Sequence, residues 1–248
     1  MPKSPTPRVI FIRHGQTEWS KSGQYTSRTD LHLTEYGVNQ ARALGKFVTG
    51  TGNSSLLNVS NVKLIISSPR YRAIQTKELV FETIDKKIMD DIPFEIDEDV
   101  REWEYGDYEG LLTKEIIQLR RERNIPDKLD ITTGKPIPWN IWADGCENGE
   151  DYTRVSIRLN RLIEKIRTLH KQALEKDEPC DVVVFGHGHI LRSFAALWLG
   201  RSLNINPQFL LDTGAVGVLS YQHHNIDEPA IHLSPFVVPM GEETEHAA

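Results

Sequence analysis

Three short apolar runs are separated by longer segments in which apolar residues recur at helical spacing. The runs are Val9–Ile12, Val62–Ile66 and Val182–Phe185. A continuous apolar run of this length is typical of a strand that is covered on both faces, as in parallel sheets. The alternation of such strands with helices predicts an α/β fold of three layers, α/β/α, with a mostly parallel central sheet.

Helix signals lie between these runs. Thr34 is predicted to cap a helix whose apolar positions run from Val38 to Phe47, and Ser68 to cap a second that starts at Pro69 and ends near Ile84. The clearest amphipathic pattern follows Asp151. The remaining chain is predicted to hold strands at 94–96 and 215–221, helices at 111–121 and after residue 188, and a proline-rich loop at 126–138.

Neither a repeat nor a linker divides the 248 residues, so we expect one domain over 6–235 and an acidic tail over 236–248. The net charge of −6 argues against nucleic-acid binding, and the apolar runs are too short for a membrane span. Cys146 and Cys180 indicate neither a disulfide framework nor a metal site. We expect a cytoplasmic protein, with nuclear entry left open.

Polar and basic residues follow each of the three strands. The carboxyl ends of neighbouring parallel strands lie at one edge of a sheet, where ligands bind. Glycines beside the histidines let backbone approach an anion, and a helix start adds positive potential. The sequence therefore predicts a phosphate pocket from Arg13, His14, Arg70, His187 and Gly188.

A metal site is the alternative interpretation of the histidines. His187 and His189, together with His14, offer imidazoles of the kind that zinc prefers. No cysteine or carboxylate stands nearby at a typical ligand spacing, so we expect no metal ion and no other cofactor. His189 is then interpreted as a residue at a helix start near the pocket.

The segment Arg13-His14-Gly15-Gln16-Thr17 follows the first strand, and Ser-Pro-Arg and Gly-His-Gly segments follow the other two. Together they resemble the signature of the histidine phosphatase superfamily, which includes cofactor-dependent phosphoglycerate mutases. The resemblance implies a phosphoglycerate mutase-like fold and a phosphohistidine intermediate on His14. It also implies that Arg13, Arg70 and His187 contact the phosphoryl oxygens.

The same resemblance implies a proton donor for the leaving oxygen. Glu102 matches the family's acidic residue in the stretch before Tyr105-Gly106. It would protonate the leaving group and then activate the water that hydrolyses phosphohistidine. Glu104 is the rival acid in the same acidic run.

Further segments resemble members of the superfamily that act on sugar bisphosphates. They are Gly23–Thr26, Arg101–Gly110, Trp139–Trp142, Asp144–Glu150 and His223–Pro229. The resemblance implies a small-molecule sugar phosphate as partner, such as sedoheptulose 1,7-bisphosphate, with fructose 1,6-bisphosphate as a weaker substrate. The expected substrate contacts are Tyr25, Thr26, Arg101 and Tyr105, and a second phosphate would need a cation from among Arg28, Arg101 and Arg192.

Departures from the family pattern make the sugar preference less firm than the chemistry. Ser27 stands where a relative has Gly, and His32 stands where relatives commonly have Pro. The 126–138 loop is long, and we expect it to reshape the substrate entrance. A phosphoglycerate mutase is disfavoured because Trp103 and Glu104 stand where mutases carry Arg and His. A phosphatase of broader range, a non-catalytic phosphate sensor or protein-binding module, and a homo-oligomeric state are left open.

Overall fold

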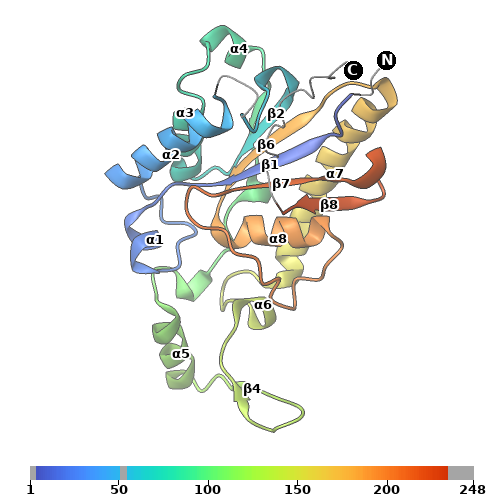
Figure 1. Cartoon of the computed structure of the whole chain (residues 1–248). Helices are drawn as coiled ribbons and strands as arrows, with labels where there is room; N and C mark the ends of the chain where they lie inside the picture. Colours follow the sequence, from blue (N-terminus) through green and yellow to red (C-terminus); the bar gives the residue numbers. More distant parts are fainter. Residues whose placement is uncertain (1–3, 51–54, 234–248) are drawn as a thin grey trace, which may run out of the picture.

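Six strands form one sheet in the order β3-β2-β6-β1-β7-β8 (Figure 1). The computed structural model describes residues 4–50 and 55–233. Strands β3, β2, β6 and β1 are parallel to one another, whereas β7 is antiparallel to both of its neighbours. The strands of this sheet are β1 (Arg8–Arg13), β2 (Val62–Ser67), β3 (Phe94–Ile96), β6 (Asp181–Gly186), β7 (Val216–Tyr221) and β8 (Pro229–His232).

Side chains from both faces of the sheet are buried. On β1, Val9 and Phe11 pack into one apolar cluster, while Ile10 and Ile12 pack into another on the opposite face. Because each face needs an apolar cover, the strand is apolar at every position and not only at alternate ones. The predicted mostly parallel, three-layer fold is confirmed.

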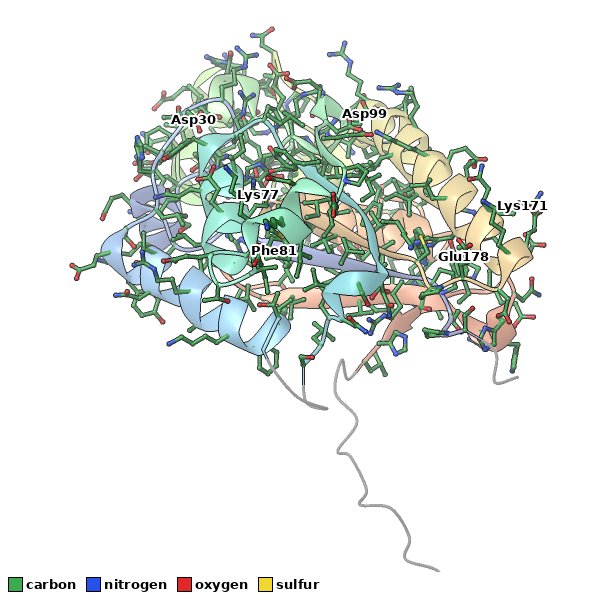
Figure 2. The ribbon with its side chains drawn as sticks, turned by 90° about the horizontal axis from the view of Figure 1, so that it is seen from above. Asp30, Lys77, Phe81, Asp99, Lys171 and Glu178 are labelled. Carbon is green, nitrogen blue, oxygen red and sulfur yellow. The ribbon has the colours of Figure 1, made fainter. Side chains whose placement is uncertain are left out.

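Helices α7 and α8 cover one face of the sheet, and α2 and α3 cover the other. Figure 2 shows α7 at the right, with Lys171 and Glu178 near its end, and α3 nearer the middle of the view, with Lys77 and Phe81. The helices are α1 (Glu18–Ser22), α2 (Glu35–Val48), α3 (Tyr71–Val80), α4 (Lys86–Asp90), α5 (Thr113–Glu122), α6 (Ile141–Asp144), α7 (Tyr152–Lys176) and α8 (Gly188–Trp198).

Two helix starts test the capping predictions. Thr34 caps α2 as predicted, because its side chain accepts a hydrogen bond from the Gly37 N–H. The prediction for α3 was wrong: the helix begins at Tyr71, after Arg70 in the N-cap position, and ends at Val80. The Ser68 hydroxyl, 2.6 Å from a ring nitrogen of His187, lies within the site and outside the helix.

The predicted 126–138 loop contains a small hairpin of β4 (Lys128–Leu129) and β5 (Pro136–Ile137), which projects from the body of the molecule (Figure 1). Lys128 ties its base to the α6 segment through the Ala143 carbonyl at 2.6 Å and the Asp144 carboxylate at 2.9 Å. Ile131, at its tip, is fully exposed.

No helix within the described part of the chain is long and apolar enough to cross a membrane. The acidic tail predicted for 236–248 lies outside the described residues, and the domain bounds 6–235 stay a prediction.

Candidate active site

The three polar segments meet at the carboxyl edge of the sheet, as the parallel strands require. The His14 N–H donates to the Gly186 carbonyl at 3.0 Å, and the Ser68 N–H donates to the Phe185 carbonyl at 2.9 Å. The first residues after β1 and β2 are thus hydrogen-bonded to the last two residues of β6. Side chains that are far apart in sequence are brought together here.

His14 is buried, and the T-shaped contact of its ring with that of His187 has a centroid distance of 5.2 Å. Its Nδ1 lies 2.7 Å from the Gly15 carbonyl, which only accepts, so Nδ1 carries the proton and Nε2 keeps its lone pair. Burial and the nearby Arg72 and Arg13 guanidinium groups hold the His14 pKa well below its usual value. The imidazole is therefore neutral, as a nucleophile must be.

His187 is held in one tautomer by two neighbours. The Arg72 Nε donates to its Nδ1 at 3.2 Å, which leaves the ring proton on Nε2, 2.6 Å from the Ser68 Oγ. Burial, followed by the charge of Arg72, keeps the His187 pKa well below its usual value. His187 is therefore a neutral donor in the same buried region as His14.

Arg72 is the arginine that sequence reasoning missed. Its side chain is fully buried, and its two terminal nitrogens donate to the carbonyls of Thr26, Thr29 and Ser27 at 3.0–3.3 Å. The only signal in the sequence is its place in the first turn of α3, two residues after the predicted Arg70. Arg70 itself is partly exposed, and its charge lowers the pKa of His187.

The Nε atoms of Arg13 and Arg70 are buried and have no hydrogen-bond partner within the described residues. Arg13 also donates from Nη1 to the Leu211 carbonyl at 2.7 Å. A Cβ at Gly188 would lie 3.2 Å from the Arg13 Cζ, so the absence of a side chain at Gly188 leaves room for this guanidinium. The unsatisfied donors indicate an anion as ligand.

Glu102 lies at the N-terminus of α8. Its carboxylate accepts hydrogen bonds from the His189 N–H at 3.1 Å and the Ile190 N–H at 2.8 Å, and from the Trp103 N–H at 2.8 Å. These three N–H groups fix its orientation at the end of the helix. Glu102 and His14 line the same cavity, so an acid and a nucleophile face one space.

That cavity has a volume of about 240 Å³. Its lining includes the expected Tyr25, Thr26, Tyr105 and Gly188, and it adds His189 and Arg192. The full lining is Arg13, His14, Thr17, Trp19, Ser20, Gly23, Gln24, Tyr25, Thr26, Glu102, Tyr105, Thr113, Gly188, His189 and Arg192.

Aromatic rings make one wall of the cavity. The Tyr25 ring stacks on His189 at a centroid distance of 5.7 Å and meets Tyr105 edge-on at 4.9 Å. The Tyr105 hydroxyl lies 2.8 Å from the His189 Nδ1. Burial, with Arg192 and Arg13 nearby, keeps the His189 pKa well below its usual value, and burial raises that of Tyr105 well above its own. Both groups stay neutral around neutral pH.

Arg101, predicted as a substrate contact, does not line the cavity. Its guanidinium donates to the Glu150 carboxylate at 2.9 Å, and Glu150 is itself paired with Arg158 at 2.8 Å. Its role as a substrate contact stays a prediction.

Glu104, the rival acid, also lies outside the cavity lining. Its carboxylate is paired with Arg28 at a partly exposed position. His223, in the turn after β7, is exposed and lies 2.6 Å from the Glu228 carboxylate. Within 4–50 and 55–233, no group of three or more histidine, cysteine or acidic side chains is arranged to hold a metal ion.

A family model of the histidine phosphatase superfamily, branch 1, matches residues 9–230. The chain belongs to this superfamily and is a phosphatase. It is 46% identical to the sedoheptulose 1,7-bisphosphatase of Saccharomyces cerevisiae, over 98% of each chain. It is also 30% identical to an acid phosphatase of Mycobacterium tuberculosis, over 87% of each chain.

Solved structures agree with the fold. The product of a Mycobacterium tuberculosis open reading frame superposes with a TM-score of 0.65 at 26% identity, over 92% of this chain and 97% of the other. The α-ribazole phosphatase of Shigella flexneri gives a TM-score of 0.66 at 20% identity, over 94% and 100%. The second match supports the fold alone.

Proposed function

We propose that this protein is a metal-independent sugar-bisphosphate phosphatase. Its substrate is sedoheptulose 1,7-bisphosphate, converted to the 7-phosphate and inorganic phosphate, and fructose 1,6-bisphosphate is a weaker substrate. The observation that carries the proposal is a cation without an acidic partner among the described residues, Arg192, in the same cavity as His14 and Glu102. The similarity to the yeast enzyme over nearly the whole chain supports it.

The reaction starts with attack of the neutral His14 Nε2 on phosphorus. The N–P bond forms as the bond between phosphorus and the sugar oxygen breaks. Glu102, which takes up a proton when the negatively charged phosphate binds beside it, gives that proton to the leaving sugar oxygen. Arg13, Arg70 and Arg72 supply the positive charge that offsets the charge on the transferring oxygens, and the neutral His187 lies beside them. The carboxylate of Glu102 then takes a proton from water, whose oxygen attacks phosphorus and releases phosphate and free His14.

Arg192 is the best candidate for the second phosphate of a bisphosphate. Arg28 is paired with Glu104 and Arg101 with Glu150, whereas no acidic side chain is paired with Arg192 in the described chain. The Arg192 guanidinium stacks over Trp142 at 5.3 Å and donates from Nε to the Gly188 carbonyl at 3.0 Å. These contacts hold it in place and leave its charge available to an anion.

The aromatic wall suits the carbon chain between the two phosphates. The Tyr25 and His189 rings offer faces against which sugar C–H groups pack, and the Tyr105 hydroxyl offers a hydrogen bond. These features favour a polyhydroxylated substrate over a small monophosphate. A role in cytoplasmic carbohydrate metabolism, among the sugar phosphates of the pentose phosphate pathway, follows from this substrate.

A phosphatase of broader range is the second candidate. The similarity to the acid phosphatase of Mycobacterium tuberculosis favours it, at lower identity and coverage than the yeast relative. Such an enzyme would use the same His14 and Glu102, but it would gain little from Arg192.

The test is phosphate release from both bisphosphates, several sugar monophosphates and 3-phosphoglycerate, each with and without chelator. We expect chelator-insensitive release that is fastest from the seven-carbon bisphosphate and absent in His14→Ala. Release from monophosphates alone would discard the sugar bisphosphate and support the broader phosphatase. Conversion of 3- to 2-phosphoglycerate would identify a mutase instead.

A further inference from the structure

The two expected substrate contacts Tyr25 and Thr26 stand on a segment without helix or strand, residues 24–29. Such a segment needs other contacts to fix its side chains. One end pairs with the chain after η3 (Gly106–Tyr108), since the Tyr25 N–H donates to the Leu111 carbonyl at 3.0 Å and the Gly110 N–H donates to the Tyr25 carbonyl at 2.7 Å. The rest has no such backbone ladder.

A single carboxylate holds the donors of the remaining part. Glu109 accepts from the Ser27 N–H at 2.9 Å, the Ser27 hydroxyl at 2.6 Å and the Thr29 N–H at 2.9 Å. The Ser27 hydroxyl oxygen also accepts a hydrogen bond from the Tyr105 N–H at 3.4 Å, which links the segment to the aromatic wall. Burial alone would raise the pKa of Glu109, but the hydrogen bonds from Ser27 and Thr29 keep it below its usual value. Glu109 is therefore ionised at neutral pH.

The carbonyls of the same segment are bound to a cation. Thr26, Ser27 and Thr29 each accept from the buried Arg72, which also donates to His187. The segment is thus clamped between the Glu109 carboxylate on its N–H side and the Arg72 guanidinium on its carbonyl side. A shift of the segment would move the sugar-side contacts relative to the phosphate-side histidine.

We propose that Glu109 and Ser27 act as positioning residues that set the spacing between the phosphate end and the sugar end of the site. Neither residue is among those that line the cavity. They act through Tyr25 and Thr26, whose backbone they hold. This inference rests on the proposed function for its sugar end only, because any phosphate ester large enough to reach Tyr25 would depend on the clamp.

The test compares Glu109→Gln and Ser27→Ala with the wild-type protein. Glutamine keeps the size of the Glu109 side chain, but its NH₂ group faces the N–H groups that the carboxylate accepted from. Alanine removes the Ser27 hydroxyl. Glu122→Gln is the matched control, because Glu122 is exposed and accepts a hydrogen bond from Gln118 on the same helix, away from the site. The substrates are the sugar phosphate that the wild-type protein hydrolyses best and p-nitrophenyl phosphate, and inhibition by orthophosphate reports on the phosphate end.

We expect Glu109→Gln to raise KM for the sugar phosphate by about tenfold or more, and Ser27→Ala by less, as fits the loss of hydrogen bonds to a charged group. The kcat on p-nitrophenyl phosphate and the Ki of orthophosphate should change by less than about threefold, as in the control. Equal losses on both substrates, or no loss on either, would overturn the inference. Circular dichroism identifies a misfolded Glu109→Gln protein, in which case Ser27→Ala alone decides.

The proposed function and this inference fail separately. If the wild-type protein hydrolyses no sugar bisphosphate, the proposed substrate is wrong, but the comparison still runs on the best sugar phosphate. If it does and the variants leave KM unchanged, the clamp has no positioning role.

Discussion

At the scale of single residues, Arg72 connects the parts of the site. It donates to His187 and to three carbonyls of the segment that bears Tyr25, while its own side chain is fully buried. A planar group with several fixed donors fits this arrangement, and a lysine does not. Arg70 lies two residues earlier, where α3 has not yet begun.

We therefore expect Arg72→Lys to lower kcat/KM by about a hundredfold or more, because several directed hydrogen bonds are lost while the charge is kept. Arg70→Lys keeps its charge in a less buried place and should lower kcat/KM by less than about tenfold. Steady-state kinetics on p-nitrophenyl phosphate measure both. If kcat/KM fell further in Arg70→Lys than in Arg72→Lys, Arg70 would be the more important arginine of the two.

These two arginines mark what the sequence could and could not predict. Arg13, His14 and His187 follow strands directly, so their place was predictable from the apolar runs alone. Arg72 depends on where α3 starts, and Arg101 depends on the distant Glu150. A single sequence gives no more for Arg72 than its place two residues after Arg70, and it gives no signal for the pairing of Arg101 with Glu150.

At the scale of elements, the helices on one face of the sheet pack with unusually close backbones. A Cβ at Gly45 of α2 would lie 2.5 Å from the Val80 carbonyl oxygen at the end of α3. Because that neighbour is backbone, it cannot move aside as a side chain would. The glycine thus sets the distance between α2 and α3, although glycine is a poor helix former.

Gly45→Ala is expected to destabilise the protein by about 1–3 kcal/mol, since overpacking outweighs the gain in helix propensity of about 1 kcal/mol. Lys46→Ala, exposed and in the same helix, is the control and should change little. Urea unfolding gives both values. A Gly45→Ala protein more stable than the wild type would show that α2 and α3 separate at no cost.

The hairpin of β4 and β5 is the second element with a clear expectation. No residue of this hairpin lines the catalytic cavity, although the loop was expected to reshape the entrance. Replacing residues 129–136 by Gly-Gly keeps Lys128 and its contacts with α6, and it should leave kcat and KM within about twofold. A rise in KM that is confined to sugar phosphates would show that the hairpin forms part of the substrate entrance.

At the scale of the whole molecule, four histidines of the described chain that stay neutral couple the fold to pH. The pKa values of His14, His187 and His189 are held well below the usual range, and burial lowers that of His170 to about 3. These histidines bind protons near pH 6.5 in the unfolded chain, but they stay unprotonated at this pH in the folded chain. Stability is therefore full above neutral pH and falls as the pH drops below about 6.5.

Each such histidine is expected to lower the free energy of unfolding by about 1.4 kcal/mol when the pH falls from 7.5 to 5.5. His170 lies outside the catalytic cavity, beside Tyr221, so His170→Gln removes one titrating group without touching the site. Urea unfolding at the two pH values should show that the free energy of unfolding falls less in this variant than in the wild type, by about 1.4 kcal/mol. An unchanged loss would contradict the neutral state of His170.

The sheet order has a consequence for biosynthesis. The pairs β1–β7 and β2–β3 are joined only through β6, residues 181–186 of 248. A nascent chain on the ribosome therefore carries the apolar runs of β1 and β2 without their shared partner until most of it has been made. Translation that stops before residue 181 leaves His14 with no neighbour across the sheet. Such a fragment exposes unpaired apolar strand segments to chaperones and proteases, and it has no enzyme activity.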